Sequence, residues 1–130
     1  MKEVILALDV PNREEAKKLV KATGPQLNWV KIGMQLYYKE GPAIVKEMKD
    51  LGVKVFLDLK LHDIPNTVKS ALLSLLSLEV DMTNVHCMGG AKMLWEAAQA
   101  VEGSSCQLIG VTQLTSSSEE QIKDELSLRV

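Results

Sequence analysis

The stretch FLDLKLHDIPNTV, residues 56–68, begins like a buried strand and then departs from that pattern. Directly after the apolar run VKVFL come four polar or ionisable side chains within six positions: Asp58, Lys60, His62 and Asp63. Burying an unpaired charge costs much free energy, so a strand that ends in this way must gain something from those charges. The stretch therefore predicts a buried strand whose end takes part in binding or chemistry.

Strand-like segments rich in Val, Ile and Leu recur at regular intervals on both sides of this stretch. They begin near residues 4, 28, 53, 81 and 106. The segments between them have helical periodicity and predict helices over residues 12–22, 41–51, 66–79, 90–101 and 118–128. Strands that alternate with helices in this way are typical of βα units arranged around a parallel sheet.

Two α/β architectures fit this repeat. One is a five-stranded open sheet, and the other is the first five units of a (β/α)8 barrel, a fold that typically needs about 250 residues. The 130 residues of this chain are one domain's worth of sequence and long enough to bury a core. Periodicity alone leaves both architectures open.

A polar residue marks the predicted end of each strand. These residues are Asp9, Lys31, Asp58 with Lys60, His86, and Thr112 followed by Thr115. In both architectures ligands bind at the carboxyl edge of the strands. Asp58 and Lys60 are two residues apart, so both side chains are expected on one face of their strand, within reach of Lys31 from the neighbouring strand. The sequence thus predicts a compact set of alternating charges made by Lys31, Asp58 and Lys60, with Asp63 as a further candidate member.

Composition and charge argue against several classes of partner. The net charge is −2 and the basic residues form no block, so we expect neither nucleic acid nor an anionic membrane as a partner. The apolar runs are too short to span a bilayer, and the N-terminus carries no cleavage site typical of a signal peptide. Cys87 and Cys106 lack CxxC spacing, which favours two reduced structural thiols in a cytoplasmic protein. No metal site is predicted, because His62, His86 and Cys87 do not make a convincing ligand set.

The stretch at residues 56–68 closely resembles the signature of the orotidine 5'-phosphate decarboxylase family, in its bacterial form. Other segments resemble that form in the same order and spacing: ALD at 7–9, VKIGMQL at 30–36, EGP at 40–42, NVH at 84–86, GG at 89–90 and VTQLTS at 111–116. The resemblance covers essentially all 130 residues. It implies the barrel alternative, with residues 1–130 as a single, partial TIM-barrel domain that supplies about the first five βα units.

The resemblance also implies an activity, which is decarboxylation of orotidine 5'-phosphate to UMP in pyrimidine biosynthesis. Lys60 would protonate the C6 carbanion, and Lys31 and Asp58 would complete the charged network of the same subunit. In a homodimer, Asp63 would enter the neighbouring subunit's site. The family uses no metal and no organic cofactor.

The remaining substrate contacts are also implied by the resemblance alone. Asp9 would bind the ribose, Thr67 would contact substrate across the dimer interface, and Thr115 would face the pyrimidine or its ribose. Family members are barrels of about twice this length, with the phosphate-binding loop in the later units, where barrels in general hold phosphate. We therefore expect the 130-residue chain by itself to be incomplete and inactive. A related sugar-phosphate decarboxylase or aldolase, and a non-catalytic half-barrel fragment, are the alternatives.

Overall fold

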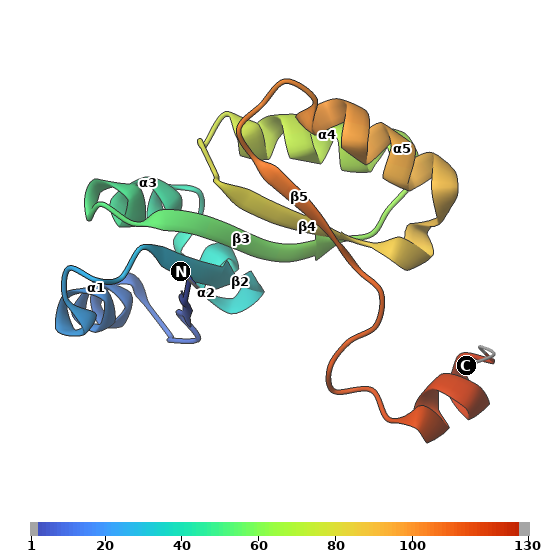
Figure 1. Cartoon of the computed structure of the whole chain (residues 1–130), viewed down its shortest axis with the longest axis horizontal. Helices are drawn as coiled ribbons and strands as arrows, with labels where there is room; N and C mark the ends of the chain where they lie inside the picture. Colours follow the sequence, from blue (N-terminus) through green and yellow to red (C-terminus); the bar gives the residue numbers. More distant parts are fainter. Residues whose placement is uncertain (1–2, 128–130) are drawn as a thin grey trace.

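The computed structural model describes residues 3–127, in which five parallel strands alternate with helices (Figure 1). The strands are β1 (Ile5–Ala7), β2 (Trp29–Gly33), β3 (Lys54–Leu61), β4 (Met82–His86) and β5 (Gln107–Val111). The helices are α1 (Arg13–Thr23), α2 (Met34–Glu40), α3 (Ala43–Asp50), α4 (Pro65–Leu76) and α5 (Gly90–Val101). Two short helical turns, η1 (Cys87–Gly89) and η2 (Gln121–Glu125), complete the described chain.

The strands lie in the sheet in the order of the sequence, β1-β2-β3-β4-β5, and every neighbouring pair is parallel. Crossovers between parallel strands are almost always right-handed. When each new strand lies on the same side of the previous one, all the connecting helices therefore lie on one face of the sheet. In a doubly wound open sheet the strand order reverses and helices cover both faces. The observed order is that of consecutive units in a (β/α)8 barrel.

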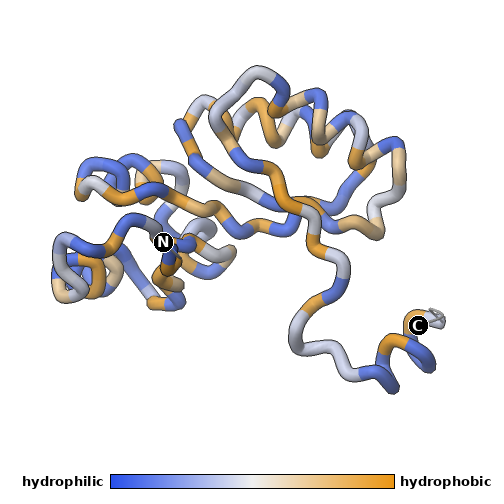
Figure 2. Tube along the Cα trace, in the orientation of Figure 1, coloured by the Kyte–Doolittle hydropathy of each residue, from blue (hydrophilic) through white to orange (hydrophobic). Residues whose placement is uncertain are grey.

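The core lies between the sheet and the helices, and it has two parts. The larger one joins β1–β3 to α1–α3 and includes Val30, Ile32, Ile44, Val45, Met48, Val55 and Leu57, none of which is exposed to solvent. The smaller one lies beneath α4 and α5 and consists of Val68, Leu72, Val85, Met93, Ala97 and Ala100. Hydrophobic and hydrophilic residues alternate along the helices, as expected for helices that bury one side (Figure 2).

The opposite face of the sheet is only partly covered. Ile5 on β1 and Ile109 on β5 are 39% and 40% exposed, although both lie within strands. Lys31 on β2 and Phe56 on β3, which pair with each other in register, are also partly exposed. This face, with its polar side chains, holds the candidate site.

The structure contains one helix that the sequence pattern did not predict. Residues 34–40 form α2, which buries only Leu36, so seven residues give too short a periodic signal to detect. Gly41 ends α2 with a φ of 71°, a conformation that glycine adopts without a steric penalty, and Pro42 is then the N-cap of α3. The single helix predicted over 41–51 is thus α3 alone.

The last predicted helix, residues 118–128, is largely wrong. After β5 the chain runs away from the sheet to a short helical turn (Figure 1), and that turn covers only Gln121–Glu125. No residue of this turn is buried, so nothing packs against it to extend it. Residue 128 lies outside the described residues. Among residues 3–127, no helix has both the length and the apolar character needed to cross a membrane.

Candidate active site

The predicted charged residues from β2 and β3 meet on the partly covered face of the sheet. Lys60 Nζ lies 2.7 Å from Asp58 Oδ1, and Lys31 Nζ lies 3.2 Å from Asp58 Oδ2. Asp9, two residues after β1, extends the series with its Oδ1 at 3.7 Å from Lys31 Nζ. Each cation therefore contacts at least one carboxylate, and Asp58 lies between the two lysines.

Lys31, Asp58 and Lys60 lie inside their strands. The sequence pattern had predicted them at the strand ends. Lys31 is the middle residue of β2, and β3 continues through Asp58 and Lys60 to Leu61. The apolar neighbours Leu57 and Leu59 belong to the core. Polar side chains are tolerated here because they lie on the face of the sheet that the helices leave uncovered.

The strand between Asp58 and Lys60 is not regular. In the pairing of β3 with β4, Leu57 is opposite Thr83 and Leu61 is opposite Val85, so four steps along β3 match two along β4. Lys60 has a φ of 52°, in the left-handed region. Simple alternation predicted that Asp58 and Lys60 would share a face, and they do meet, but across a bulge.

Asn84 belongs to the same cluster, although the sequence reasoning did not select it. It is 2% exposed on β4, its Nδ2 donates to Asp58 Oδ1 at 2.7 Å, and its Oδ1 accepts the backbone N–H of Lys60 at 2.8 Å. The available signal was a neutral amide within a strand that also contains Thr83 and His86, and an amide carries less information than a charge. Its position opposite the bulge could not be read from the sequence.

Asp58 is held as a carboxylate by its neighbours. Burial by itself would raise the pKa of this carboxyl, but hydrogen bonds from Lys60, Asn84 and Lys31, together with the charge of Lys60, lower the pKa below its ordinary value. The side chain is almost fully buried, so these three donors take the place of the water that a carboxylate would otherwise bind. The site therefore keeps a fixed negative charge between two cations.

A hollow of about 460 Å³ lies over this cluster. Its lining comes from β2, β3, β4, the end of β5 and the segment that follows it: Lys31, Phe56, Asp58, Lys60, Asn84, Val111, Gln113, Leu114, Thr115 and Ser116. Thr115, predicted to contact substrate, is exposed on this lining. The hollow thus offers two ammonium groups, a carboxylate and hydroxyl groups to a small polar molecule.

Asp63 and Thr67 do not join this cluster in the described chain. Both are exposed and line a separate hollow of about 280 Å³, which also includes Tyr38 and Lys60. Asp63 Oδ1 accepts the backbone N–H of Ile64 at 2.7 Å, and no ion pair within residues 3–127 joins it to Lys31 or Lys60. Within the described residues, Asp63 therefore lies outside the set that Lys31, Asp58 and Lys60 form. Its predicted place in a neighbouring subunit's site stays a prediction.

The two histidines lie close together at this edge of the sheet. The ring centroids of His62, after β3, and His86, at the end of β4, are 5.4 Å apart. Within residues 3–127 there is no group of three or more His, Cys, Asp or Glu side chains that could hold a metal ion. Cys87 and Cys106 are both free thiols.

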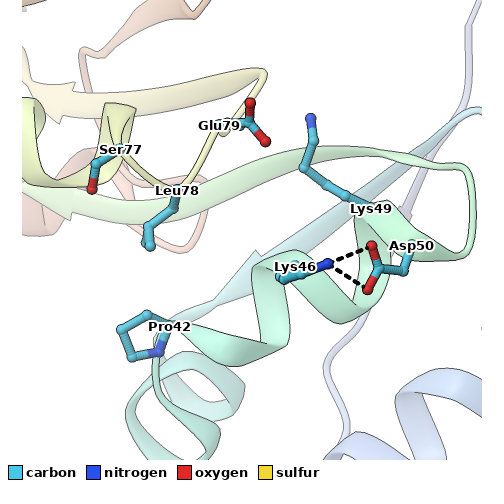
Figure 3. A pocket seen from close by; sticks show the side chains of 7 residues that line it. All are labelled: Pro42, Lys46, Lys49, Asp50, Ser77, Leu78 and Glu79. Atoms are coloured by element: carbon cyan, nitrogen blue, oxygen red, sulfur yellow. Dashed lines mark hydrogen bonds and ion pairs between the residues drawn. The ribbon is translucent and has the colours of Figure 1, made fainter.

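Another hollow, of about 220 Å³, lies between α3 and the turn after α4 (Figure 3). Its two lysines are already paired, Lys46 with Asp50 at 2.8 Å and Lys49 with Asp81 at 2.9 Å. The turns that precede β3 and β4 form the amino edge of the sheet, which in barrels contributes to stability rather than to chemistry. The hollow over Asp58 is therefore the candidate active site.

Two curated relatives match nearly the whole chain. The orotidine 5'-phosphate decarboxylase of Bacillus cytotoxicus is 48% identical over 133 residues, which cover 98% of this chain and 56% of that protein. The orotidine 5'-phosphate decarboxylase of Halalkalibacterium halodurans is 47% identical over 135 residues, covering 99% and 57%. The chain thus spans little more than half the length of these relatives.

Solved structures show the same fold. The orotidine 5'-phosphate decarboxylase of Lactobacillus acidophilus superposes with a TM-score of 0.90 at 37% identity, over 100% of this chain and 61% of that one. The enzyme from Methanocaldococcus jannaschii, in complex with the inhibitor BMP, superposes with a TM-score of 0.84 at 27% identity, over 98% and 58%. These matches confirm the predicted architecture, in which the chain supplies about the first five βα units of a (β/α)8 barrel.

A family model agrees with these matches and covers almost every position. The model of the orotidine 5'-phosphate decarboxylase / HUMPS family matches residues 2–130. The matched range contains every residue of the charged cluster and both hollows beside Lys60. The resemblance predicted from residues 56–68 is therefore confirmed, and the chain belongs to the orotidine 5'-phosphate decarboxylase / HUMPS family.

Proposed function

We propose that this chain contributes to an enzyme that decarboxylates orotidine 5'-phosphate to UMP, a step of pyrimidine biosynthesis. The observation that carries the proposal is the buried carboxylate of Asp58 between the ammonium groups of Lys31 and Lys60, at the base of an open hollow. The relatives of known name support the choice of reaction.

The reaction requires a fixed cation at one carbon atom. When the C6–carboxylate bond breaks, carbon dioxide leaves and the electron pair stays on C6, in a ring position without a conventional electron sink. Lowering this barrier requires the upper part of the roughly 8–23 kcal/mol that enzymes supply. Lys60 stabilises the developing carbanion by its charge and then transfers a proton to C6, which forms the C6–H bond of UMP. Lys60 regains a proton from solvent.

Repulsion between Asp58 and the substrate carboxylate is too small to be the main effect. Two like charges about 4 Å apart interact by roughly 4 kcal/mol at an effective dielectric constant near 20. That corresponds to about a thousandfold in rate. The larger contribution is the pre-positioned ammonium of Lys60, which acts where charge develops in the transition state. Asp58 contacts both ammonium groups and directs them at the hollow.

The remaining contacts of the proposal follow the family. Asp9 binds the ribose, and Thr115 faces the pyrimidine or its ribose. The protein is a cytoplasmic homodimer, in which Asp63 and Thr67 reach the neighbouring subunit's site. In support of this, both side chains are exposed, and exposed Tyr38 lies beside them. The reaction as proposed uses no metal and no organic cofactor.

The test is substitution of Lys60 by alanine in the full-length protein. We expect Lys60→Ala to abolish turnover of orotidylate while UMP still binds, because the lost interaction acts mainly in the transition state. Lys46→Ala is the matched control, since Lys46 is an exposed lysine on α3 that pairs with Asp50, away from the hollow over Asp58.

Two results would contradict the proposal. A Lys60→Ala protein with even a tenth of the normal rate would remove Lys60 from the role of acid. EDTA-sensitive activity on a sugar phosphate, with none on orotidylate, would instead support the sugar-phosphate decarboxylase or aldolase alternative.

A further inference from the structure

The bulge in β3 lies opposite a single residue of β4. Between the paired positions Leu57–Thr83 and Leu61–Val85, three residues of β3 face only Asn84. A bulge of this kind leaves backbone groups without partners in the sheet. One of them is the N–H of Lys60, and the side chain of Asn84 accepts it at 2.8 Å.

The other end of the Asn84 amide is used as well. Its Nδ2 donates at 2.7 Å to Asp58 Oδ1, the same oxygen that Lys60 Nζ contacts. Chemistry fixes the orientation of this amide, because a backbone N–H can only donate and an ionised carboxylate can only accept. A reversed amide would place two donors against each other and two acceptors against each other.

Lys60 is held in an unfavourable backbone conformation. A φ of 52° is uncommon for a residue other than glycine, and such a conformation persists only where the surroundings impose it. Here Asn84 holds the backbone of Lys60, and Asp58, itself fixed by Asn84, holds the ammonium. The lysine is therefore constrained at both ends by interactions that meet at Asn84.

We propose that Asn84 is a positioning residue that directs the Lys60 ammonium into the hollow, through the Lys60 backbone on one side and Asp58 on the other. The proposal rests on the proposed decarboxylase function for its kinetic consequences. Asn84 itself transfers no proton in this scheme.

The neighbouring residue Thr83 provides a matched control. It is also fully buried on β4, and its Oγ1 donates to the backbone oxygen of Leu57 on β3 at 3.0 Å. Thr83→Val therefore removes a buried hydrogen bond between the same two strands without touching Asp58 or Lys60. It measures the effect of weakening the strand pair alone.

Two substitutions in the full-length protein separate the two bonds of Asn84. Asn84→Leu removes both at similar volume, whereas Asn84→Asp keeps the acceptor for the Lys60 N–H and replaces the donor to Asp58 by a second carboxylate. We expect both variants to lose roughly 100-fold in kcat, the effect of a misplaced reacting group, with KM little changed. Thr83→Val is expected to lower the unfolding midpoint and leave kcat unchanged.

The dependence of kcat on pH separates a positioning role from general structural damage, because such damage would not change the shape of the pH profile. In Asn84→Asp the two carboxylates at positions 58 and 84 share a proton as pH falls, and the protonated group again donates to its neighbour. The charged groups around them are Lys31 and Lys60, with Asp9 beside Lys31. We expect kcat of Asn84→Asp, relative to the unsubstituted protein, to rise on acidification, and kcat of Asn84→Leu not to rise.

A measurement independent of turnover keeps this inference separate from the proposed function. Amide hydrogen exchange by NMR should show the Lys60 N–H protected in the unsubstituted protein and in Thr83→Val, and unprotected in Asn84→Leu. Unchanged kcat together with unchanged Lys60 protection in Asn84→Leu would overturn the inference. Loss of protection in a protein that never turns over orotidylate would support the positioning by Asn84 and refute the decarboxylase proposal.

Discussion

At the scale of single residues, the site depends on the ionised state of Asp58. A buried carboxylate without partners is costly, and the same carboxylate between two ammonium groups stabilises the fold. Its side chain is 9% exposed, whereas the side chains of Lys31 and Lys60 are 26% and 28% exposed. Because water reaches both lysines, the cost of removing the carboxylate charge is reduced by screening to about 1–3 kcal/mol.

The first prediction is that Asp58→Asn destabilises the protein in a pH-dependent way. The pKa of Asp58 in the folded state lies below its ordinary value of 3.8, so its stabilising effect is present above that pH and is lost as pH falls through the folded pKa. Urea unfolding should show a deficit of about 1–3 kcal/mol at pH 7 that shrinks towards pH 3. The exposed Asp50→Asn is the control and should change stability by less than about 1 kcal/mol. An equal deficit at both pH values would contradict the prediction.

The residues of this cluster differ in how visible they are in the sequence. Lys31, Asp58 and Lys60 were predicted because charges in apolar strands have few structural uses. Asn84 was not, because a neutral amide in a strand is compatible with an ordinary buried hydrogen bond. Lys60 in a left-handed conformation was equally invisible, because only a bulge in the pairing with β4 requires it.

At the scale of elements, local signals determine where the helices begin and end. Asn12 is the N-cap of α1, and its side chain accepts the backbone N–H of Glu15 at 3.0 Å. Gly52, two residues after the end of α3, has a φ of 85°. These signals were readable because capping depends on residues adjacent in sequence. The helix α2 was missed because its stability comes from its neighbours rather than from its own pattern.

The second prediction tests the cap of α1. Asn12→Ala leaves the N–H of Glu15 without its side-chain acceptor and should cost about 1 kcal/mol in the free energy of unfolding. Asn28→Ala is the matched control, because Asn28 is an exposed asparagine just before β2. It should change stability by less than about 0.5 kcal/mol. Equal effects of the two substitutions in urea unfolding would rule out the capping role.

The third prediction concerns the contact between η1 and β5. A Cβ added at Gly110 would lie 2.6 Å from Cys87 Sγ, so Gly110→Ala should destabilise the protein by about 1–3 kcal/mol. Cys87→Ala removes the opposing sulfur. The double variant should therefore be more stable than the sum of the two single effects, with a coupling of at least about 0.5 kcal/mol. Strictly additive effects would show that the sulfur and β5 do not share this space.

At the scale of the whole molecule, the face of the sheet that carries the site is also the face that the described chain covers least. Ile5 and Ile109 are partly exposed there, and β1 and β5 each pair with only one neighbour. The relatives are longer, since the chain spans 56% and 57% of the two compared. A single barrel domain over residues 1–130, and inactivity of that polypeptide by itself, stay predictions. Turnover of orotidylate by the 14.3 kDa polypeptide would contradict the second.

The regular spacing of βα units predicted the parallel sheet, because a repeat of hydrophobic segments requires no knowledge of distant contacts. No comparable repeat in the sequence shows how two chains would complete one site. Asp63 and Lys60 are three residues apart and both line the smaller hollow, yet only Lys60 also lines the hollow over Asp58 and contacts Asp58. A site shared between subunits therefore has to be tested with mixed subunits.

The last prediction uses Lys60→Ala and Asp63→Ala in the full-length protein. In the proposed two-fold dimer, each site combines Lys60 of one chain with Asp63 of the other, so both homodimeric variants should be nearly inactive. Unfolding and refolding them together should give about half heterodimers, in which one site is intact and the other carries both substitutions, so about a quarter of the activity should return.

The control mixes Lys60→Ala with Asp58→Asn, because Lys60 and Asp58 touch within one chain. Every site in that heterodimer carries one substitution, so this mixture should recover nothing. Recovery in the first mixture and not in the second would identify Asp63 as the residue that crosses the interface. If neither mixture recovers while native mass spectrometry shows heterodimers, then Asp63 serves its own chain, and the shared site must be abandoned.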